Sequence, residues 1–144
     1  MLWRLWSFFG VCDRRGAEPR ESLLLRWLVE TPWYPTALCS RRYVHWEMLD
    51  HDNAARATVA DGATRASAVF VFSPDCSQIL SITGERSWHD PRAPALPWTV
   101  EFSSYKRLGG FVVPTTAVVK RAAGARRDSV TLVRAEVTDV EYQV

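Results

Sequence analysis

The chain has 144 residues and a formal net charge of +2, with 47% apolar and 24% charged residues. This length suffices for one domain with a core of its own, and the composition is that of an ordinary globular protein. A charge this balanced argues against nucleic acid as a partner, so we expect none. We predict a single domain over residues 1–144, with an N-terminal part of residues 1–42 and a strand-rich part of residues 43–144.

The three cysteines, Cys12, Cys39 and Cys76, are widely spaced, and no C-x-x-C motif occurs. A zinc site or a disulfide framework is therefore not expected, and reduced thiols fit a cytoplasmic protein. The apolar start, Met1–Val11, contains Arg4. It lacks the layout of a signal peptide and is too short for a membrane span. We expect neither an export signal nor a membrane-spanning segment.

The first 42 residues predict a strand, a helix and a stiff proline segment. Aromatic enrichment favours a strand over Leu2–Val11. The best helix candidate is Glu21–Thr31, whose apolar stripe consists of Leu24, Trp27, Leu28 and Thr31. Pro32 ends this helix, because the residue before a proline is disfavoured in the α region. The following segment, Pro32–Pro35, is predicted to be extended.

The remainder of the chain alternates apolar and polar residues in short runs broken by turn signals, which is typical of an antiparallel meander. The strongest turn signals are Asp61-Gly62 and Gly109-Gly110. Pro114 indicates an edge strand or a bulged strand, and a phase change in the last run predicts a bulge near Thr138-Asp139. The predicted strands are Tyr43–Leu49, Ala55–Ala60, Ala63–Phe72, Ile79–Trp88, Trp98–Tyr105, Phe111–Lys120 and Val130–Val144.

No catalytic or metal-binding constellation stands out in the sequence. His45, His51 and His89 each have an acid nearby, but the meander places His51 and His89 at opposite ends of the sheet. A metal site needs several such ligands together, so we expect no metal and no cofactor. Cys76, His51 and Asp52 fall at the same end and carry the groups of a nucleophilic triad. Incidental turn residues are the favoured interpretation, and we predict no catalytic residues.

Several segments resemble motifs of an uncharacterised bacterial domain family, over a stretch from about Trp6 to Tyr142. The matching segment of its P-W-F-P-T-A-L motif is Pro32-Trp33-Tyr34-Pro35-Thr36-Ala37-Leu38. The residues similar to its P-W-x-x-x-F-x-x-Y-x-x-x-x-G-x-x-V-P-T motif are Pro97, Trp98, Phe102, Tyr105, Gly110, Val113, Pro114 and Thr115. The segment similar to its W-E-P-I-D strand is Val44-His45-Trp46-Glu47. The segment similar to its A-R-A-T-L-x-D-G hairpin is Ala55-Arg56-Ala57-Thr58-Val59, followed by Asp61-Gly62.

The resemblance implies the half-open barrel of the outer-membrane lipoprotein carriers, in which a curved antiparallel sheet surrounds a helix. The resemblance implies no catalytic residues, because no activity is established for the family. Members usually carry more sequence before the segment that matches Leu2–Val11, so we expect a shortened member or the C-terminal part of one. The chain departs from the family pattern at Tyr34, at Cys39 and in the loop Arg121–Asp128.

We therefore predict an α+β fold, a curved antiparallel meander of six to seven strands that forms a half-open barrel packed around one α-helix. The preferred function is non-enzymatic binding of an apolar or lipid-like molecule in the concave face of the sheet. The candidate lining residues are Trp27, Trp33, Trp46, Phe70, Phe72, Trp98 and Phe102. For each ring, plain core packing is the competing interpretation.

Two other functions stay open. The first is a structural or interaction domain that self-associates, as a homodimer, through an open sheet edge. The second and least favoured is a thiol enzyme that uses Cys76.

Overall fold

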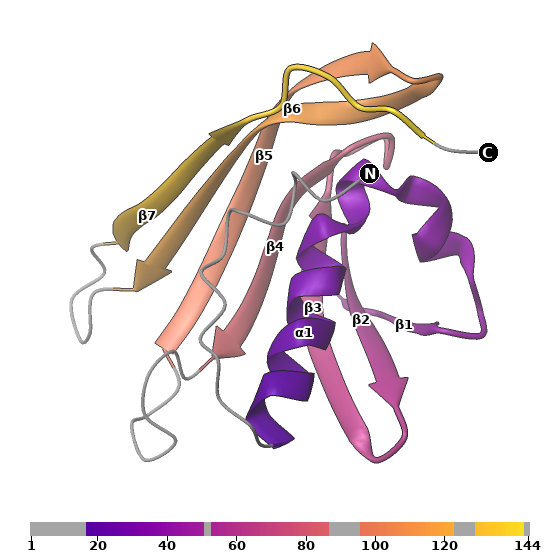
Figure 1. Ribbon diagram of the computed structural model, residues 1–144, viewed down its shortest axis with the longest axis vertical. Coiled ribbons are helices and arrows are strands. Elements are labelled where there is room, and N and C mark those ends of the chain that lie inside the picture. Colours follow the sequence, from indigo (N-terminus) through magenta and orange to yellow (C-terminus); the bar gives the residue numbers. More distant parts are fainter. Residues whose placement is uncertain (1–16, 51–52, 87–95, 123–128, 143–144) are drawn as a thin grey trace.

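The computed structural model describes residues 17–50, 53–86, 96–122 and 129–142. Their strands form one antiparallel sheet in the order β1-β2-β3-β4-β5-β6-β7, so each strand pairs with its neighbours in sequence (Figure 1). The strand expected over Leu2–Val11 lies outside the described residues. The strands are β1 (Val44–Met48), β2 (Ala54–Asp61), β3 (Thr64–Phe72), β4 (Ile79–Arg86), β5 (Leu96–Leu108), β6 (Phe111–Ala122) and β7 (Ser129–Glu136).

Glycine turns close two of the hairpins. Gly62 has a φ of +58° and begins the two-residue loop between β2 and β3. Gly109 and Gly110 have φ values of +55° and +89° and join β5 to β6. Glycine adopts these left-handed conformations at little cost, and such tight loops match the twist of antiparallel strands. The sequence predicted both turns, because each depends on local chemistry alone.

The predicted α+β class is wrong, because 58% of the described residues lie in strands and a single α-helix accompanies them. This helix, α1 (Ala17–Glu30), has 14 residues, which makes it about 21 Å long and about 10 Å wide. Seven strands at a spacing of about 4.8 Å extend over about 29 Å. The helix therefore covers about two strands rather than filling a barrel, and its main strand contacts are with β3 and β2.

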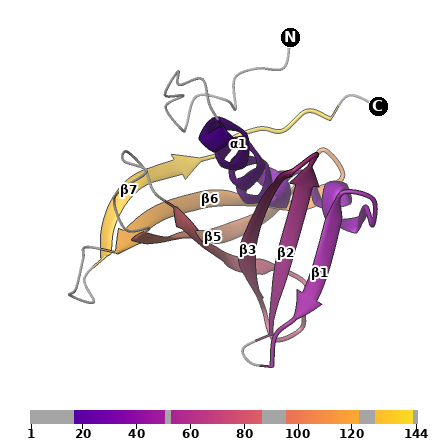
Figure 2. The same cartoon turned by 90° about the horizontal axis from the view of Figure 1, so that it is seen from below.

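The sheet bends so that β1–β3 and β5–β7 lie at a wide angle to each other, and α1 lies on the inner side of this bend (Figure 2). The strand registers define the residues that point to this side, which we call the inner face. The inner face includes Val44, Trp46, Ala57, Val59, Ala66, Ala68, Phe70, Ile82, Trp98, Val100, Phe102, Ala117, Val119, Val133 and Ala135.

No helix in the described part of the chain is long and apolar enough to cross a membrane.

Small side chains on the inner face allow α1 to lie close to the sheet. Ala57 of β2 pairs with Ala68 of β3, and both are fully buried. They belong to one apolar cluster with Leu25, Leu28 and Val29 of the helix. A methyl group occupies little space between backbones, so the leucine side chains reach the strands at van der Waals distance. The helix is thus positioned by alanines in the sheet beneath it.

The buried stripe of α1 differs from the predicted one. Leu25 and Val29 are buried, whereas Trp27 is 37% exposed. Leucines occupy positions 23, 24 and 25, so the hydrophobic pattern fits more than one rotation of the helix. Packing against β2 and β3 selects the rotation that buries the third of these leucines.

The segment after α1 is helical rather than extended, which corrects the prediction for Pro32–Pro35. It forms two short 3₁₀ helices, η2 (Thr31–Trp33) and η3 (Pro35–Cys39). Proline is favoured in the first turn of a helix, and each of these helices has one there. The Thr31 hydroxyl donates to the Leu28 carbonyl, which satisfies an acceptor that the end of α1 leaves open.

Pro114 lies in β6, which is an interior strand between β5 and β7. The prediction of an edge strand is therefore wrong for most of its length. The pairing of β6 with β7 covers Thr116–Ala122, however, so Pro114 lies beyond it. Because proline has no N–H to donate, its position costs no hydrogen bond to β7.

The bulge predicted near Thr138-Asp139 is also misplaced, because β7 ends at Glu136. The register between β6 and β7 shifts instead at Val119/Lys120, opposite Leu132 of β7.

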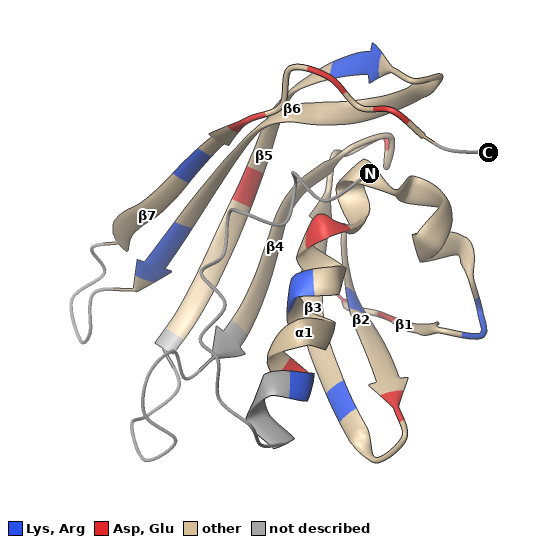
Figure 3. Cartoon of the chain, viewed as in Figure 1, with Lys and Arg blue, Asp and Glu red and all other residues tan. Residues whose placement is uncertain are grey.

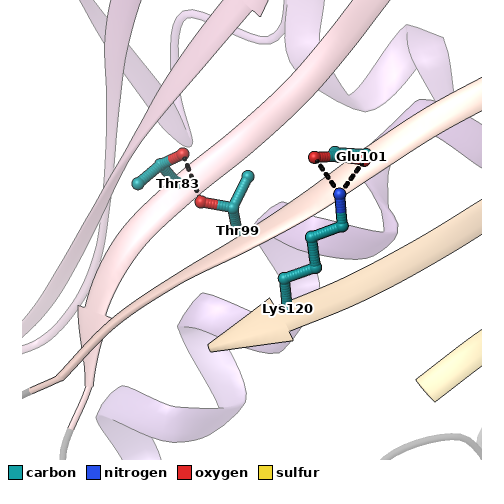
Figure 4. Close-up of polar contacts among 4 residues, drawn as sticks. All are labelled: Thr83, Thr99, Glu101 and Lys120. Atoms are coloured by element: carbon teal, nitrogen blue, oxygen red, sulfur yellow. Dashed lines mark hydrogen bonds and ion pairs between the residues drawn. The ribbon is translucent and has the colours of Figure 1, made fainter. Parts of the chain in front are cut away.

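The outer face of the sheet carries polar pairs between neighbouring strands. The hydroxyls of Thr83 and Thr99 lie 3.1 Å apart, and Lys120 Nζ lies 2.6 and 2.7 Å from the two carboxylate oxygens of Glu101 (Figure 4). Charges of both signs are spread over the helix and the strands (Figure 3). Exposed ion pairs contribute at most about 1 kcal/mol each, so we attribute the stability mainly to the apolar inner face.

A tyrosine hydroxyl takes the place of strand pairing where β4 and β5 separate. Their register ends at Ser81 and Glu101, and Ile79 lies beyond it. Tyr105 Oη accepts a hydrogen bond from the Ile79 N–H (3.1 Å) and donates one to the Ile79 carbonyl (2.6 Å). Ser104, the residue before this tyrosine, has a φ of +57°. The side chain thus satisfies backbone groups that the bent β5 no longer reaches.

The Gly84 position tests the packing of β4 against β5. Gly84 pairs with Trp98, and a Cβ built on the glycine would lie 2.8 Å from Trp98 Cζ2. We expect Gly84→Ala to lower the free energy of unfolding by about 1–3 kcal/mol, the usual cost of overpacking, as measured by urea denaturation. In a Trp98→Phe background the same change should cost less. A neutral or stabilising Gly84→Ala would contradict the close approach.

The Tyr105 hydroxyl predicts a dependence of stability on alkaline pH. Burial raises its pKa from 10.0 to about 12, although the hydrogen bond to Ile79 opposes the shift. The unfolded chain therefore loses this proton first, and the contribution to stability is present below pH 10 and is lost as the pH rises towards 12. We expect urea unfolding between about pH 9 and pH 11 to show a smaller loss of stability for Tyr105→Phe than for the wild type. Equal losses in the two proteins would refute this role.

Candidate ligand-binding face

The structure places most of the candidate rings on the inner face or against it, but Trp27 lies apart. Trp27 is on α1, is 37% exposed and is not a member of the apolar cluster. Trp46 and Phe72 are half-buried. The buried candidates are Trp33, Phe70, Trp98 and Phe102.

The first aromatic group consists of Trp46, Phe70 and Phe72 on strands β1 and β3. The Trp46 ring meets Phe70 edge-on with 5.1 Å between centroids, and its centroid is 6.2 Å from that of Phe72. Trp46 Nε1 donates to the Leu38 carbonyl at 3.1 Å, so the polar atom of the ring is satisfied by η3. The partly exposed surface of this group is therefore apolar.

The second aromatic group centres on Trp33, which joins three distant segments. Its Nε1 donates to the Pro114 carbonyl at 2.8 Å, and its ring meets Phe102 edge-on at 5.6 Å. The Tyr142 hydroxyl donates to the Trp33 backbone carbonyl at 2.8 Å, and the Tyr142 ring packs against Phe111 at 4.9 Å. These contacts connect the end of α1 with the β5–β6 hairpin and with the segment after β7.

Burial also affects the ionisation of Tyr142. It raises the pKa of the hydroxyl, and nearby Tyr34 raises it further. The phenol is therefore neutral at physiological pH and acts as a hydrogen-bond donor to Trp33.

Trp98 is the centre of a row of residues that crosses β4, β5, β6 and β7. Gly84, Trp98, Arg121 and Val130 pair successively in register, which places their side chains on the same face of the sheet. Trp98 is 4% exposed, and its Nε1 has no hydrogen-bond partner among the residues that the structure describes. Most buried polar atoms in native proteins do have one. Arg121 is half-buried and forms no salt bridge with a described residue.

The candidate thiol lies in an exposed turn. Cys76 is exposed and has a φ of +56°. The adjacent Asp75 accepts hydrogen bonds from the hydroxyls of Ser73 (2.6 Å) and Ser77 (2.8 Å), which lower its pKa to about 2. This carboxylate organises the turn. The other two members of the hypothesised triad, at positions 51 and 52, lie outside the described residues, as does His89.

No group of three or more His, Cys, Asp or Glu residues suited to hold a metal ion occurs within the part of the chain that the structure describes.

Sequence reasoning missed the long-range hydrogen bonds that connect the segments of this face. Tyr105, Pro114 and Tyr142 form hydrogen bonds to Ile79 and Trp33, across 26, 81 and 109 residues of the chain. Gly84 was not recognised as the position that makes room for Trp98. An isolated glycine within a strand can signal such a close approach, and this was the one local sign available.

Comparison with known proteins identifies a family but no function. The model of a family of unknown function, DUF6920, matches residues 1–142. A search of the curated proteins found no match, and a search of the solved structures found none. The similarity to the lipoprotein carriers therefore stays a prediction. Because the family match includes every described strand and helix, the chain belongs to the family of unknown function DUF6920.

Proposed function

We propose that this protein is a non-enzymatic binding module that holds an apolar molecule against the inner face of its sheet. The observation that carries the proposal is that the apolar face spans more strands than the helix contacts. The face extends over all seven strands, whereas the main strand contacts of α1 are with β2 and β3. The apolar side chains of this face on β4–β7 are nevertheless mostly buried, so α1 alone does not account for their cover, and a concave apolar face of this kind is typical of a site for an apolar ligand.

The rim at β1 and β3 supports entry of such a molecule. Met48 follows Trp46 on the same side of β1 and is 76% exposed. Phe72, beside Trp46, is half-buried. Methionine and aromatic side chains adapt to apolar ligands of varied shape. A ligand that enters here would contact these side chains first and then the buried rings of β5.

The proposal predicts saturable binding of the neutral apolar fluorophore N-phenyl-1-naphthylamine, followed by its fluorescence. Phe72→Ser should weaken binding by about tenfold, because a ring of this size loses about 1.4 kcal/mol or more of apolar contact. The matched control is Val69→Ser on the outer face of the same strand, which should bind like the wild type. A fluorescence rise that does not saturate, or equal weakening in both variants, would refute the proposal.

A second proposal, self-association, is favoured by the outer edge of β7. This strand ends the sheet that the described residues form, and its Val130 and Leu132 are 48% and 38% exposed. An edge strand has unpaired N–H and C=O groups that can pair with another chain.

Light scattering coupled to size-exclusion chromatography tests this second proposal. We expect a dimer mass for the wild type at high concentration and a monomer mass for Leu132→Lys, because a charge at the edge opposes pairing. The control Val112→Lys alters an exposed residue that precedes the β6–β7 pairing and should leave the dimer intact. A wild-type protein that stays monomeric at every concentration would rule out this function.

A further inference from the structure

The inner face of β4–β6 is buried, although α1 packs on other strands. Ile82 of β4, Val100 of β5 and Val119 of β6 pair successively in register and form one row across these strands. They are 0%, 1% and 4% exposed, whereas the main strand contacts of α1 are with β3 and β2. Side chains that stand on a sheet become this inaccessible only beneath a second layer. Another segment of the chain is therefore needed above this row.

The width of the covered strip suits a single segment. The row continues from Val119 to Val133 of β7, which is only half-buried, so the cover ends near β6. Trp33 packs on Phe102, two residues further along β5 than Val100. Three strands at a spacing of about 4.8 Å extend over about 14 Å, and a helix is about 10 Å wide. One further element beside α1 is enough to cover this strip.

Among the segments outside the described residues, the N-terminal one has the composition of such a cover. Residues 87–95 contain one large apolar side chain, Trp88, together with two prolines, and residues 123–128 contain none. Residues 1–11 contain a single charged side chain, that of Arg4. Burial removes the most apolar surface from water in a segment of this kind. Its apolar members are Met1, Leu2, Trp3, Leu5, Trp6, Phe8, Phe9 and Val11.

The connection to α1 is long enough for this placement. The helix begins at Ala17, and the apolar segment ends at Val11. An extended chain covers about 3.5 Å per residue, so the residues between these two positions can span about 20 Å. The distance across the sheet from β3, which α1 contacts, to β6 is about 14 Å. Residues 1–11 can therefore lie beside α1 and above β4–β6.

We propose that residues 1–11 dock on the β4–β6 part of the inner face and compete there with the ligand. The docking is argued from burial and composition, and the competition rests on the proposed binding function. An apolar ligand reaches this part of the face only by displacing the segment. Its apparent affinity is then reduced by the fraction of molecules in which the face is uncovered.

Thiol labelling measures how accessible the buried row is. Val119→Cys introduces a thiol there, and its reaction with iodoacetamide is followed by peptide mass spectrometry, which distinguishes it from the native cysteines. The double variant Trp3→Ser/Trp6→Ser, here called the N-terminal double variant, should accelerate this reaction about tenfold, because the segment loses apolar contact with the sheet. Residues three apart point to opposite sides of an extended segment, so one of the two rings faces the sheet.

Two controls show whether the effect is local. Leu23→Ser/Trp27→Ser removes a similar pair of side chains from the exposed side of α1 and should leave the labelling of Val119→Cys slow. Val59→Cys places the same probe at a buried position of β2, and this thiol should stay unreactive in the N-terminal double variant. Unchanged labelling of Val119→Cys, or equal acceleration at both probe positions, would overturn the docking.

A nuclear magnetic resonance measurement tests the docking with the aromatic residues intact. Ser7→Cys carries a nitroxide in the middle of the segment, in a chain whose native cysteines are replaced by serine. The nitroxide should broaden the methyl signals of Val119 more than those of Val44, which lies about 24 Å away across the sheet. Equal broadening would refute the docking. If the broadening arises between spin-labelled chains and separate isotope-enriched chains in a mixture, the occupant is a second copy and docking within one chain is overturned.

Fluorophore binding separates the competition from the function on which it rests. The N-terminal double variant should bind N-phenyl-1-naphthylamine about tenfold more tightly than the wild type, because the uncovered fraction rises by this factor. If the fluorophore saturates with equal affinity in both proteins, the binding function stands and the competition is overturned. If it saturates in neither while the labelling of Val119→Cys still accelerates, the binding function fails and the docking alone is supported.

Discussion

The packing of α1 against the small side chains of β2 and β3 determines which part of the inner face the helix can cover. Ala57 and Ala68 let Leu28 reach the sheet, and burial of one such leucine contributes about 2 kcal/mol. A helix in this position does not also cover β4–β7. The only described α-helix therefore packs on two strands, and it does not account for the apolar side chains of the other strands.

Trp33 connects the end of α1 with the half of the sheet that β5–β7 form. Its indole N–H donates a hydrogen bond to the Pro114 carbonyl, and its own backbone carbonyl accepts one from the Tyr142 hydroxyl. The end of α1, the β5–β6 hairpin and the segment after β7 are therefore connected at one residue. Hydrogen bonds to a buried aromatic side chain combine apolar burial with directional geometry, which suits a residue that sets the angle between the two halves of the bend.

Local chemistry predicted the strands and turns well, because a meander is built from neighbouring segments. Gly62, Gly109 and the alternation of Trp98, Val100 and Phe102 sufficed for most of the sheet. The fold class was wrong because the sequence does not show how little of a sheet a 14-residue helix covers. The sequence did not determine which side of α1 faces the sheet, because three leucines are consecutive and each fits the hydrophobic pattern of a different rotation.

Among the candidate site residues, the inner-face rings followed from strand parity, whereas Trp27 did not, since its exposure depends on that rotation. The Trp98–Arg121 pair was beyond sequence reasoning because it needs the β5–β6 register. The positions of large rings and alanines on the inner face have a common reason, because the alanines let the helix approach the sheet and the rings fill or line the space beside it.

The most direct test of apolar ligand binding is native mass spectrometry of the protein purified gently from its own host. We expect a species heavier than the bare chain, whose extra mass disappears on extraction with organic solvent. A spectrum that shows the bare chain alone would refute ligand binding.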